Sequence, residues 1–124
     1  DSVIFAPQLE GQEFIALGRE DRTRQDIERA LDNAGVAVDH RFETPFADTA
    51  CALVAQGLGV SIVDPFSAAR WEGKLTIRPF SPGLLCDIYM VRNRAQVSSM
   101  LQQAFEREFR TALEENLSRG TRLF

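Results

Sequence analysis

The fold of this chain is decided by residues 44–69, TPFADTACALVAQGLGVSIVDPFSAA. Thr44 can cap a helix, and Pro45 suits its first turn because the N–H groups there have no intrahelical partner. Small and apolar residues then recur at helical spacing until Gly57, which predicts the end of the helix because glycine tolerates the left-handed conformation. After the turn, residues 60–63 are expected to form a short, largely buried strand. The stretch therefore predicts a helix that feeds directly into a strand.

The end of this stretch predicts a place where a ligand can bind. Asp64 and Pro65 end the predicted strand, and a short helix is expected from Phe66 to Trp71. A helix N-terminus and the carboxyl end of a strand thus lie close together in the sequence. In open α/β sheets, small ligands bind outside the carboxyl ends of the strands.

The segments on either side complete an alternating pattern of strands and helices. Before the stretch, the pattern predicts a loop at residues 1–12, a strand at Phe14–Leu17, a helix at Arg22–Ala34 between Asp21 and Gly35, and a half-exposed strand at Val36–Phe42. After it, the pattern predicts a strand at Leu75–Arg78, a turn-rich break at Pro79–Gly83, a strand at Leu85–Arg92 and a helix at Ala95–Leu117. Such an order implies right-handed crossovers and a mainly parallel sheet flanked by helices, which is an α/β fold.

The last predicted helix carries a sustained apolar stripe with a period near 3.6 residues. Its members are Val97, Met100, Leu101, Phe105, Phe109, Leu113 and Leu117. Soluble monomers rarely expose so large an apolar patch. We therefore expect a second copy of the chain to cover this face, unless another segment is supplied to do so.

Three segments carry a resemblance to a known family. They are LVAQGLGVSIVDPFSA at residues 53–68, LEGQEFIAL at residues 9–17 and IYMVRN at residues 88–93. In this order and spacing, the segments resemble the effector-binding domain of LysR-type transcriptional regulators, specifically its C-terminal part. They cover nearly the whole chain, and none of them is a catalytic motif.

The resemblance implies a fold like that of type 2 periplasmic binding proteins. Residues 1–83 would be the second subdomain, residues 84–118 the return hinge strand and C-terminal helix of the first subdomain, and residues 119–124 a tail. The family's winged helix-turn-helix and the first half of its first subdomain are missing here, so we expect the chain to be a fragment of a regulator. Residues 22–42 resemble the second subdomain's share of the family's antiparallel dimer interface.

Composition bounds the function further. The 124 residues carry a net charge of −4, so contact with DNA is expected only through the winged helix-turn-helix that this chain lacks. No apolar run reaches the length of about 18 residues that spans a bilayer. No secretion signal is seen either, so we expect a cytoplasmic protein without membrane contact. Cys51 and Cys86 have no metal-binding spacing and are expected to be reduced thiols, so no metal and no other cofactor is predicted.

Residues with catalytic potential do not form a recognisable active site. His40, the single histidine, is expected on a half-exposed strand at the surface. Ser61 lacks the Gly-x-Ser-x-Gly spacing of a nucleophile elbow. Gly57 and Gly59 lack the third glycine of a dinucleotide fingerprint, and they precede a strand instead of following one. We therefore predict no catalytic residues and no enzymatic activity.

A binding cleft is the functional site that the pattern favours. Three segments, residues 17–19, 43–48 and 64–66, should meet at one edge of a parallel sheet. The N-terminus of the central helix offers free N–H groups and a partial positive charge to an anion there. The resemblance implies that the same segments contribute to the effector cleft, although each could instead be an ordinary connecting loop. The predicted effector-binding residues are Leu17, Gly18, Arg19, Glu43, Thr44, Pro45, Phe46, Asp64, Pro65 and Phe66.

These observations favour an effector-sensing fragment of a bacterial LysR-type regulator, forming a homodimer or tetramer in the intact protein. The expected effector is a small organic acid or an amino-acid-like molecule. Asp64 could pair with a cationic group of such a ligand, while the helix start takes a carboxylate. The alternatives are a stand-alone periplasmic-type solute-binding protein and an enzyme of the same architecture.

Overall fold

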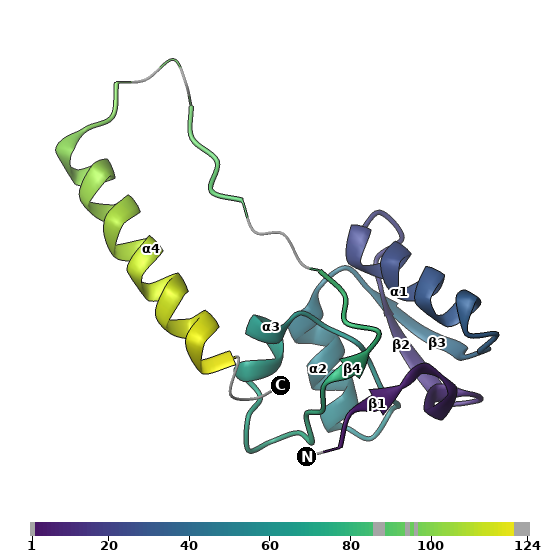
Figure 1. Ribbon diagram of the computed structural model, residues 1–124. Coiled ribbons are helices and arrows are strands. Elements are labelled where there is room, and N and C mark those ends of the chain that lie inside the picture. The colour runs from purple at the N-terminus through teal and green to yellow at the C-terminus, as the bar shows by residue number, and fades with distance from the viewer. Residues whose placement is uncertain (1, 86–88, 94, 96, 121–124) are drawn as a thin grey trace. The chain divides into compact units, whose positions relative to one another are not determined.

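The computed structural model describes residues 2–85, 89–93, 95 and 97–120. The chain divides into two compact units, Asp1–Cys86 and Asp87–Phe124 (Figure 1). The first unit contains β1 (Ile4–Phe5), the 3-10 helix η1 (Ala6–Leu9), β2 (Glu13–Leu17), α1 (Arg22–Asn33), β3 (Asp39–Thr44), α2 (Ala47–Ala55), α3 (Pro65–Ala69) and β4 (Phe80–Ser81). The second unit contains α4 (Met100–Gly120).

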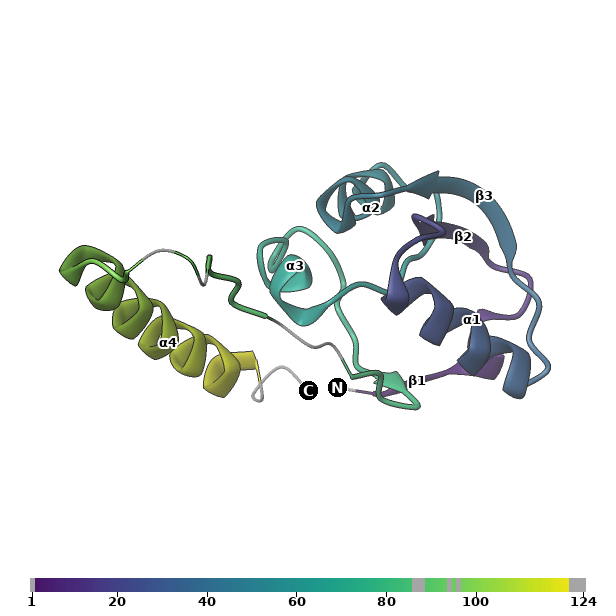
Figure 2. The ribbon, with the colours of Figure 1, turned by 90° about the horizontal axis from the view of Figure 1, so that it is seen from above.

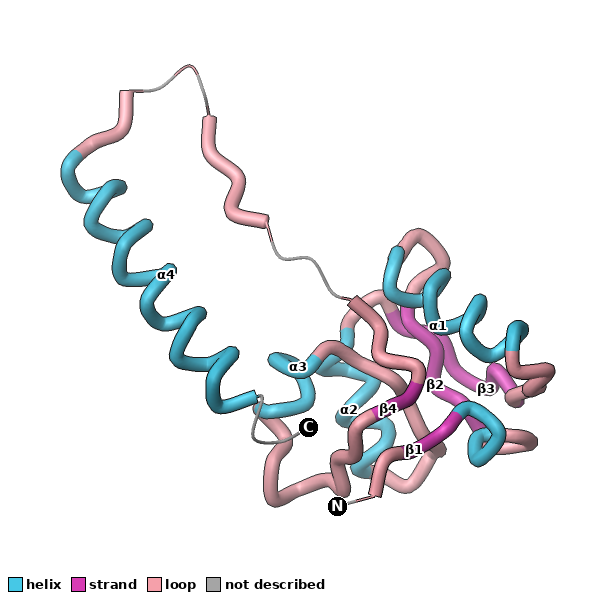
Figure 3. Tube along the Cα trace, viewed as in Figure 1, coloured by secondary structure: helices cyan, strands magenta, loops and turns pink. Residues whose placement is uncertain are grey.

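Strand β2 is the centre of the first unit. It pairs in parallel with β3, and the last pair of this ladder is Leu17 and Thr44. On its other side, Phe14 forms a parallel bridge with Val60. A separate parallel pair joins β1 to β4, and Figure 3 shows the two pairs. The structure therefore has the predicted mixture of helices and parallel strands.

Both faces of β2 are covered by helices. Phe14 and Ala16 pack in one core cluster, together with Ile27 and Leu31 of α1. The alternate residues Ile15 and Leu17 pack in a second cluster with Ala50 of α2. Figure 2 shows α1 and α2 on different sides of β2. Burial on both faces explains why this strand is an unbroken apolar run instead of an alternating one.

Helix α1 has the predicted boundaries to within one residue. The Asp21 carboxylate accepts the N–H of Thr23 at 2.7 Å, which satisfies one free donor of the first turn. At the other end, Gly35 adopts a φ of 67°, in the region that favours glycine. Arg24, Ile27, Ala30 and Leu31 form the buried face of the helix, whereas Ala34, the predicted last residue, is exposed.

The strand predicted at Val36–Phe42 lies later in the chain, at Asp39–Thr44. The reason lies in the loop before β2, whose Glu10 carboxylate accepts the N–H of Ala37 at 2.8 Å. The carbonyl of Ala37 in turn accepts the N–H of Gly11 at 2.9 Å. These bonds hold residues 36–38 against the loop, outside the sheet.

The predicted start of the central helix was also wrong. Thr44 is the buried last residue of β3, and its hydroxyl accepts the N–H of Phe46 at 3.3 Å. Helix α2 begins after Phe46, which is its N-cap without a side-chain capping bond, so Pro45 lies before the helix. The predicted C-terminal stop is confirmed, since Gly57 has a φ of 76°.

The strand predicted at residues 60–63 was wrong, because only Val60 pairs with β2, in an isolated bridge with Phe14, and residues 60–63 are half-buried instead of largely buried. Val60 donates to the Glu13 carbonyl at 2.9 Å and accepts from the Ile15 N–H at 2.8 Å. The ladder then stops, because the Ser61 hydroxyl donates to the Ile15 carbonyl at 2.8 Å and competes for this acceptor. Within the part of the chain that the structure describes, the backbone N–H and C=O groups of Ser61 and Ile62 form no hydrogen bond.

The later strand predictions were wrong as well. Leu75–Arg78 is not a strand, and β4 lies instead inside the predicted turn-rich break, where Pro79 accepts the N–H of Ile4 at 2.8 Å. Sequence patterns gave no sign of this pairing, since β1 was expected to be loop. Of the strand predicted at Leu85–Arg92, Leu85 and residues 89–92 are not in a strand, and residues 86–88 lie outside the described residues.

Helix α4 begins later than predicted and ends later. Ser99 accounts for its start, because its hydroxyl accepts the N–H of Gln102 at 3.1 Å as an N-terminal cap would. The helix continues through Arg119 and Gly120, which were expected in the tail, while residues 121–124 lie outside the described part. Within the stripe, the rings of Phe105 and Phe109 stack with centroids 5.9 Å apart.

Candidate functional site

The carboxyl ends of β2 and β3 meet at one edge of the first unit. Leu17 and Thr44, the last residues of the two strands, are partners in the ladder. The loops that follow touch as well, since a Cβ atom on Gly18 would lie 3.4 Å from the Cα of Pro45. The structure thus brings together two of the three predicted segments, and we call residues 17–19 and 43–46 the strand-end site.

Arg24 of α1 holds the strand-end site in place, and only 8% of the surface of Arg24 is exposed. Its guanidinium donates to the carbonyl of Leu17 at 2.8 Å and to the carboxylate of Glu43 at 2.6 Å. It also donates to Glu28, one helical turn along α1, at 2.7 Å. The hydrogen bond with Glu43 is the main reason that the pKa of Arg24 lies above its ordinary value. One buried cation therefore ties both strand ends to α1.

Sequence reasoning missed Arg24, although a signal was present. Arg24, Ile27 and Leu31 follow the i, i+3, i+7 spacing of one helical face. A charged residue in the buried stripe of an amphipathic helix is seldom buried unless it is paired. That position could have been identified as an arginine with a buried carboxylate or carbonyl partner.

Arg19 is the second cation of the strand-end site, and it is held loosely. Its side chain is 81% exposed, and its Nε lies 3.5 Å from the Glu43 carboxylate. The hydrogen bond from Arg24 is the main influence that lowers the pKa of Glu43 below its usual value, and the contact with Arg19 adds to it. Glu43 is therefore an ionised carboxylate held firmly by one arginine and weakly by another.

The third predicted segment, Asp64–Phe66, opens α3. The Asp64 carboxylate accepts the N–H groups of Phe66 and Ser67 at 3.0 and 2.9 Å, and the Ser67 hydroxyl at 2.6 Å. Both carboxylate oxygens are thus engaged in capping α3. Among the residues that the structure describes, no hydrogen bond or ion pair joins Asp64 to Arg19 or Glu43.

The N-terminus of α2 also opens toward this region. Phe46 is 68% exposed and provides no side-chain cap, so the first N–H groups of the helix are not satisfied by it. Asp48 in the first turn accepts the indole N–H of Trp71 at 2.9 Å, and Arg70 lies 3.8 Å from the same oxygen. These contacts connect α2 to the segment after α3.

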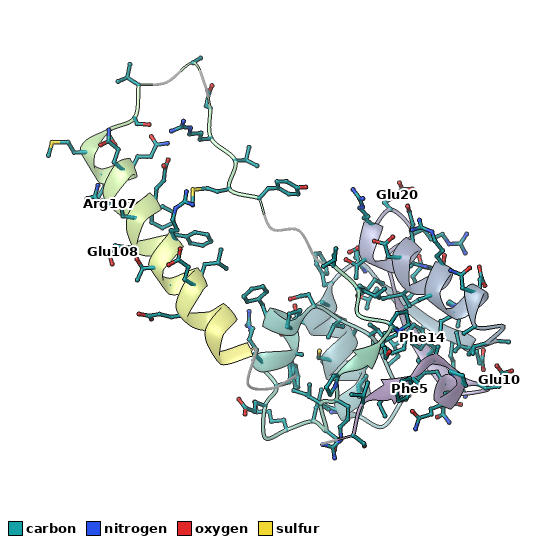
Figure 4. All side chains as sticks on the ribbon, viewed as in Figure 1. Phe5, Glu10, Phe14, Glu20, Arg107 and Glu108 are labelled. Atoms are coloured by element: carbon teal, nitrogen blue, oxygen red, sulfur yellow. The ribbon has the colours of Figure 1, made fainter. Side chains whose placement is uncertain are left out.

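A cavity of about 450 Å³ lies elsewhere in the first unit, and none of the predicted site residues lines it. Its lining comes from β1, η1, residues 60–62 and the segment that leads into β4. Figure 4 labels Phe5, Glu10 and Phe14 of this unit. The lining residues are Ile4, Gln8, Leu9, Gln12, Val60, Ser61, Ile62, Thr76, Arg78 and Phe80.

Cys51 is a buried free thiol, and burial raises its pKa, with smaller contributions from Asp48 and Asp64. Cys86 lies outside the described part. In that part, no three His, Cys, Asp or Glu side chains gather as metal ligands would, and no helix is both long and apolar enough to cross a membrane.

Comparison with known proteins gives the class to which this parallel α/β arrangement belongs. Residues 3–114 match the family described as LysR substrate binding domain. The chain therefore belongs to that family, which confirms the resemblance seen in its three sequence segments.

Two kinds of relative show the same relationship. The regulatory protein NocR of Agrobacterium tumefaciens (strain T37) is 39% identical over 80 residues, which are 64% of this chain and 27% of NocR. The transcriptional activator protein LysR of Escherichia coli (strain K12) is 30% identical over 112 residues, which are 90% of this chain and 36% of LysR. The chain thus matches between about a quarter and a third of these curated relatives.

Proposed function

We propose that this chain is an effector-sensing part of a LysR-type transcription regulator, and that its strand-end site forms one wall of the effector cleft. Family membership supports the first statement, since the relatives are named as a regulatory protein and a transcriptional activator. The observation that carries the second is Arg19, an exposed arginine beside the carboxyl ends of two parallel strands, where α/β sheets bind ligands.

The effector class follows from the charges at this edge. Arg19 can bind a carboxylate through its planar guanidinium, and the uncapped start of α2 offers further N–H donors. A small organic acid or an amino-acid-like molecule suits these groups. In the amino-acid-like case, the cationic end would need an acid on the far side, for which Asp64 is the remaining candidate at the start of α3.

The rest of the proposal concerns the larger protein. There, residues 1–83 would serve as the second subdomain, and residues 84–118 would return to the first. DNA would be bound by a winged helix-turn-helix outside these residues, in a cytoplasmic homodimer or tetramer. We propose no catalytic activity, because the relatives are named as regulators and not as enzymes. The same names favour a regulator over a stand-alone solute-binding protein.

Thermal-shift screening of the complete regulatory domain against small carboxylates and amino acids tests this function. A ligand that binds the native state raises the melting temperature, and the shift grows with the logarithm of its concentration relative to its dissociation constant. We expect hits among carboxylates, and we expect Arg19→Gln to remove most of the shift. Arg29→Gln is the matched control, because Arg29 forms an exposed ion pair with Asp26 on α1. A carboxylate shift that is unchanged in Arg19→Gln would place the anion site elsewhere.

A further inference from the structure

We propose that Arg24 is a positioning residue that keeps Arg19 available to a ligand by holding the competing carboxylate of Glu43. This inference rests on the proposed function, because it concerns how the strand-end site recognises an anion. It adds a residue that the comparisons do not identify and that was missed in the sequence.

The competition arises because one carboxylate lies within reach of two arginines. The same oxygen of Glu43 accepts from Arg24 at 2.6 Å and from Arg19 at 3.5 Å. The first distance is that of a strong charge-assisted hydrogen bond, and the second is at the limit of one. Glu43 therefore pairs mainly with Arg24.

Burial makes this division of partners stable. The Arg24 side chain is only 10% exposed, whereas the Arg19 side chain is 81% exposed. A buried guanidinium that lost its carboxylate would be costly, while an exposed one can pair with solvent at little cost. Arg24 is also fixed from two other directions, by the Leu17 carbonyl and by Glu28. The arrangement therefore favours Glu43 bound to Arg24, with Arg19 left for an incoming carboxylate.

Removing Arg24 should redirect Glu43 toward its remaining neighbour. Glu43 would then neutralise Arg19 as an internal competitor, and an added carboxylate would have to displace it. The ligand site would still contain every residue that touches the ligand, yet it would bind anions less tightly. Removing Glu43 in the same molecule should restore binding, because the competitor is gone.

Acetate is a suitable probe, since it presents a carboxylate and little else. We would titrate acetate into the nitrogen-15-labelled chain and follow the Nε–H signal of Arg19 by NMR. Exposed ion pairs of this kind are worth up to about a fivefold change in affinity. We therefore expect Arg24→Gln to weaken acetate binding at Arg19 by about two- to fivefold, and the double variant Arg24→Gln with Glu43→Gln to return it to the wild-type value.

Matched variants separate this inference from effects of net charge or of folding. Arg24→Gln with Glu28→Gln has the same net charge as the rescued double variant but keeps Glu43, so we expect no rescue. Glu43→Gln alone leaves the buried arginine in place and should bind acetate at least as well as the wild type. This single variant keeps the test valid even if Arg24→Gln fails to fold.

The outcomes also separate the inference from the proposed function. Unchanged acetate binding in a folded Arg24→Gln, weaker binding in Glu43→Gln, or equal rescue by Glu28→Gln would each overturn the role of Arg24 and leave the carboxylate site standing. An Arg19 signal that does not respond to acetate in the wild type would overturn both.

Discussion

Gly59 lies directly against the backbone of Glu13, so close that a Cβ atom built on Gly59 would overlap the Glu13 carbonyl oxygen. The same carbonyl accepts the N–H of Val60 at 2.9 Å. Gly59 also has a φ of 139°, a conformation that residues with a side chain rarely adopt. The turn between α2 and residues 60–63 is therefore fixed onto β2 by a contact that only glycine permits.

Replacing this glycine should be costly. We expect Gly59→Ala to lower the free energy of unfolding by about 2–4 kcal/mol, because backbone strain and a clash with a buried strand act together. Gly73→Ala is the matched control, since Gly73 has a φ of 77° but open space around it. Strain alone should cost the control about 1–2 kcal/mol. Urea unfolding measures both values, and equal losses would show that the contact with Glu13 contributes nothing.

The ionisation of Glu43 predicts how the free energy of unfolding changes at acidic pH. Its pKa is lower in the folded chain than its ordinary value near 4.5, mainly through the hydrogen bond from Arg24. The unfolded state therefore binds the proton more readily, and the stabilisation is fully present above about pH 4.5 and is lost as the pH falls through the folded pKa. Urea unfolding from pH 7 to pH 3 should show the wild type losing its advantage over Glu43→Gln. A constant difference at every pH would contradict this linkage.

Two substitutions at Asp64 can separate its structural role in capping α3 from a role in recognising the effector. We expect Asp64→Ala to lower the free energy of unfolding by about 0.5–2 kcal/mol, the usual value of an N-cap, because three hydrogen bonds at the start of α3 are lost. Asp64→Asn keeps an acceptor for the cap but removes the charge, so it should fold nearly as stably. If the effector has a cationic group near Asp64, calorimetry on the complete domain should show weaker binding to Asp64→Asn. Equal affinity for dicarboxylates and amino acids, unchanged in that variant, would count against an amino-acid-like effector.

The apolar stripe of α4 predicts self-association of the chain. Leu101 and Phe105 are 81% and 62% exposed, and fully burying such side chains is worth about 1.5–3 kcal/mol each. We expect light scattering to show a dimer that dissociates on dilution, and Phe105→Lys to shift it toward the monomer.

Arg107→Gln is the control for this experiment, because Arg107 is two residues from both stacked phenylalanines and so faces another direction. Figure 4 shows Arg107 and Glu108 projecting from one side of α4. A monomer at every concentration that binds no hydrophobic dye would show that one chain covers its own stripe.

Local signals explain which elements could be predicted from the sequence. Helix α1 has a capping aspartate and a terminating Gly35 within its own segment, so its boundaries were readable. Strand β2 was predictable because burial on both faces leaves a continuous apolar run. The errors arose where a distant group decides the conformation. The Glu10 carboxylate holds Ala37 outside the sheet, and the β1–β4 pair joins residues from opposite ends of the first unit.

The candidate site shows the same limit. The contact between Leu17 and Thr44 could be predicted, because the alternating order of strands and helices implies that the two strands are parallel. Arg24 was overlooked because its partners, Leu17 and Glu43, lie on other elements. The capping role of Asp64 was readable from its place before Pro65, although Asp64 was interpreted as the end of a strand and as a partner for a cationic ligand group.

The incomplete ladder at Ser61 and Ile62 has a consequence for the behaviour of the chain at high concentration. A strand edge with unpaired N–H and C=O groups can recruit an extended segment of another molecule, which is how sheets grow into aggregates. This edge borders the cavity lined by Ile4 and Phe80, so a recruited strand would gain apolar contact as well as hydrogen bonds. Because the Ser61 hydroxyl ends the ladder on β2, the unpaired backbone of residues 61 and 62 is left as a template for aggregation.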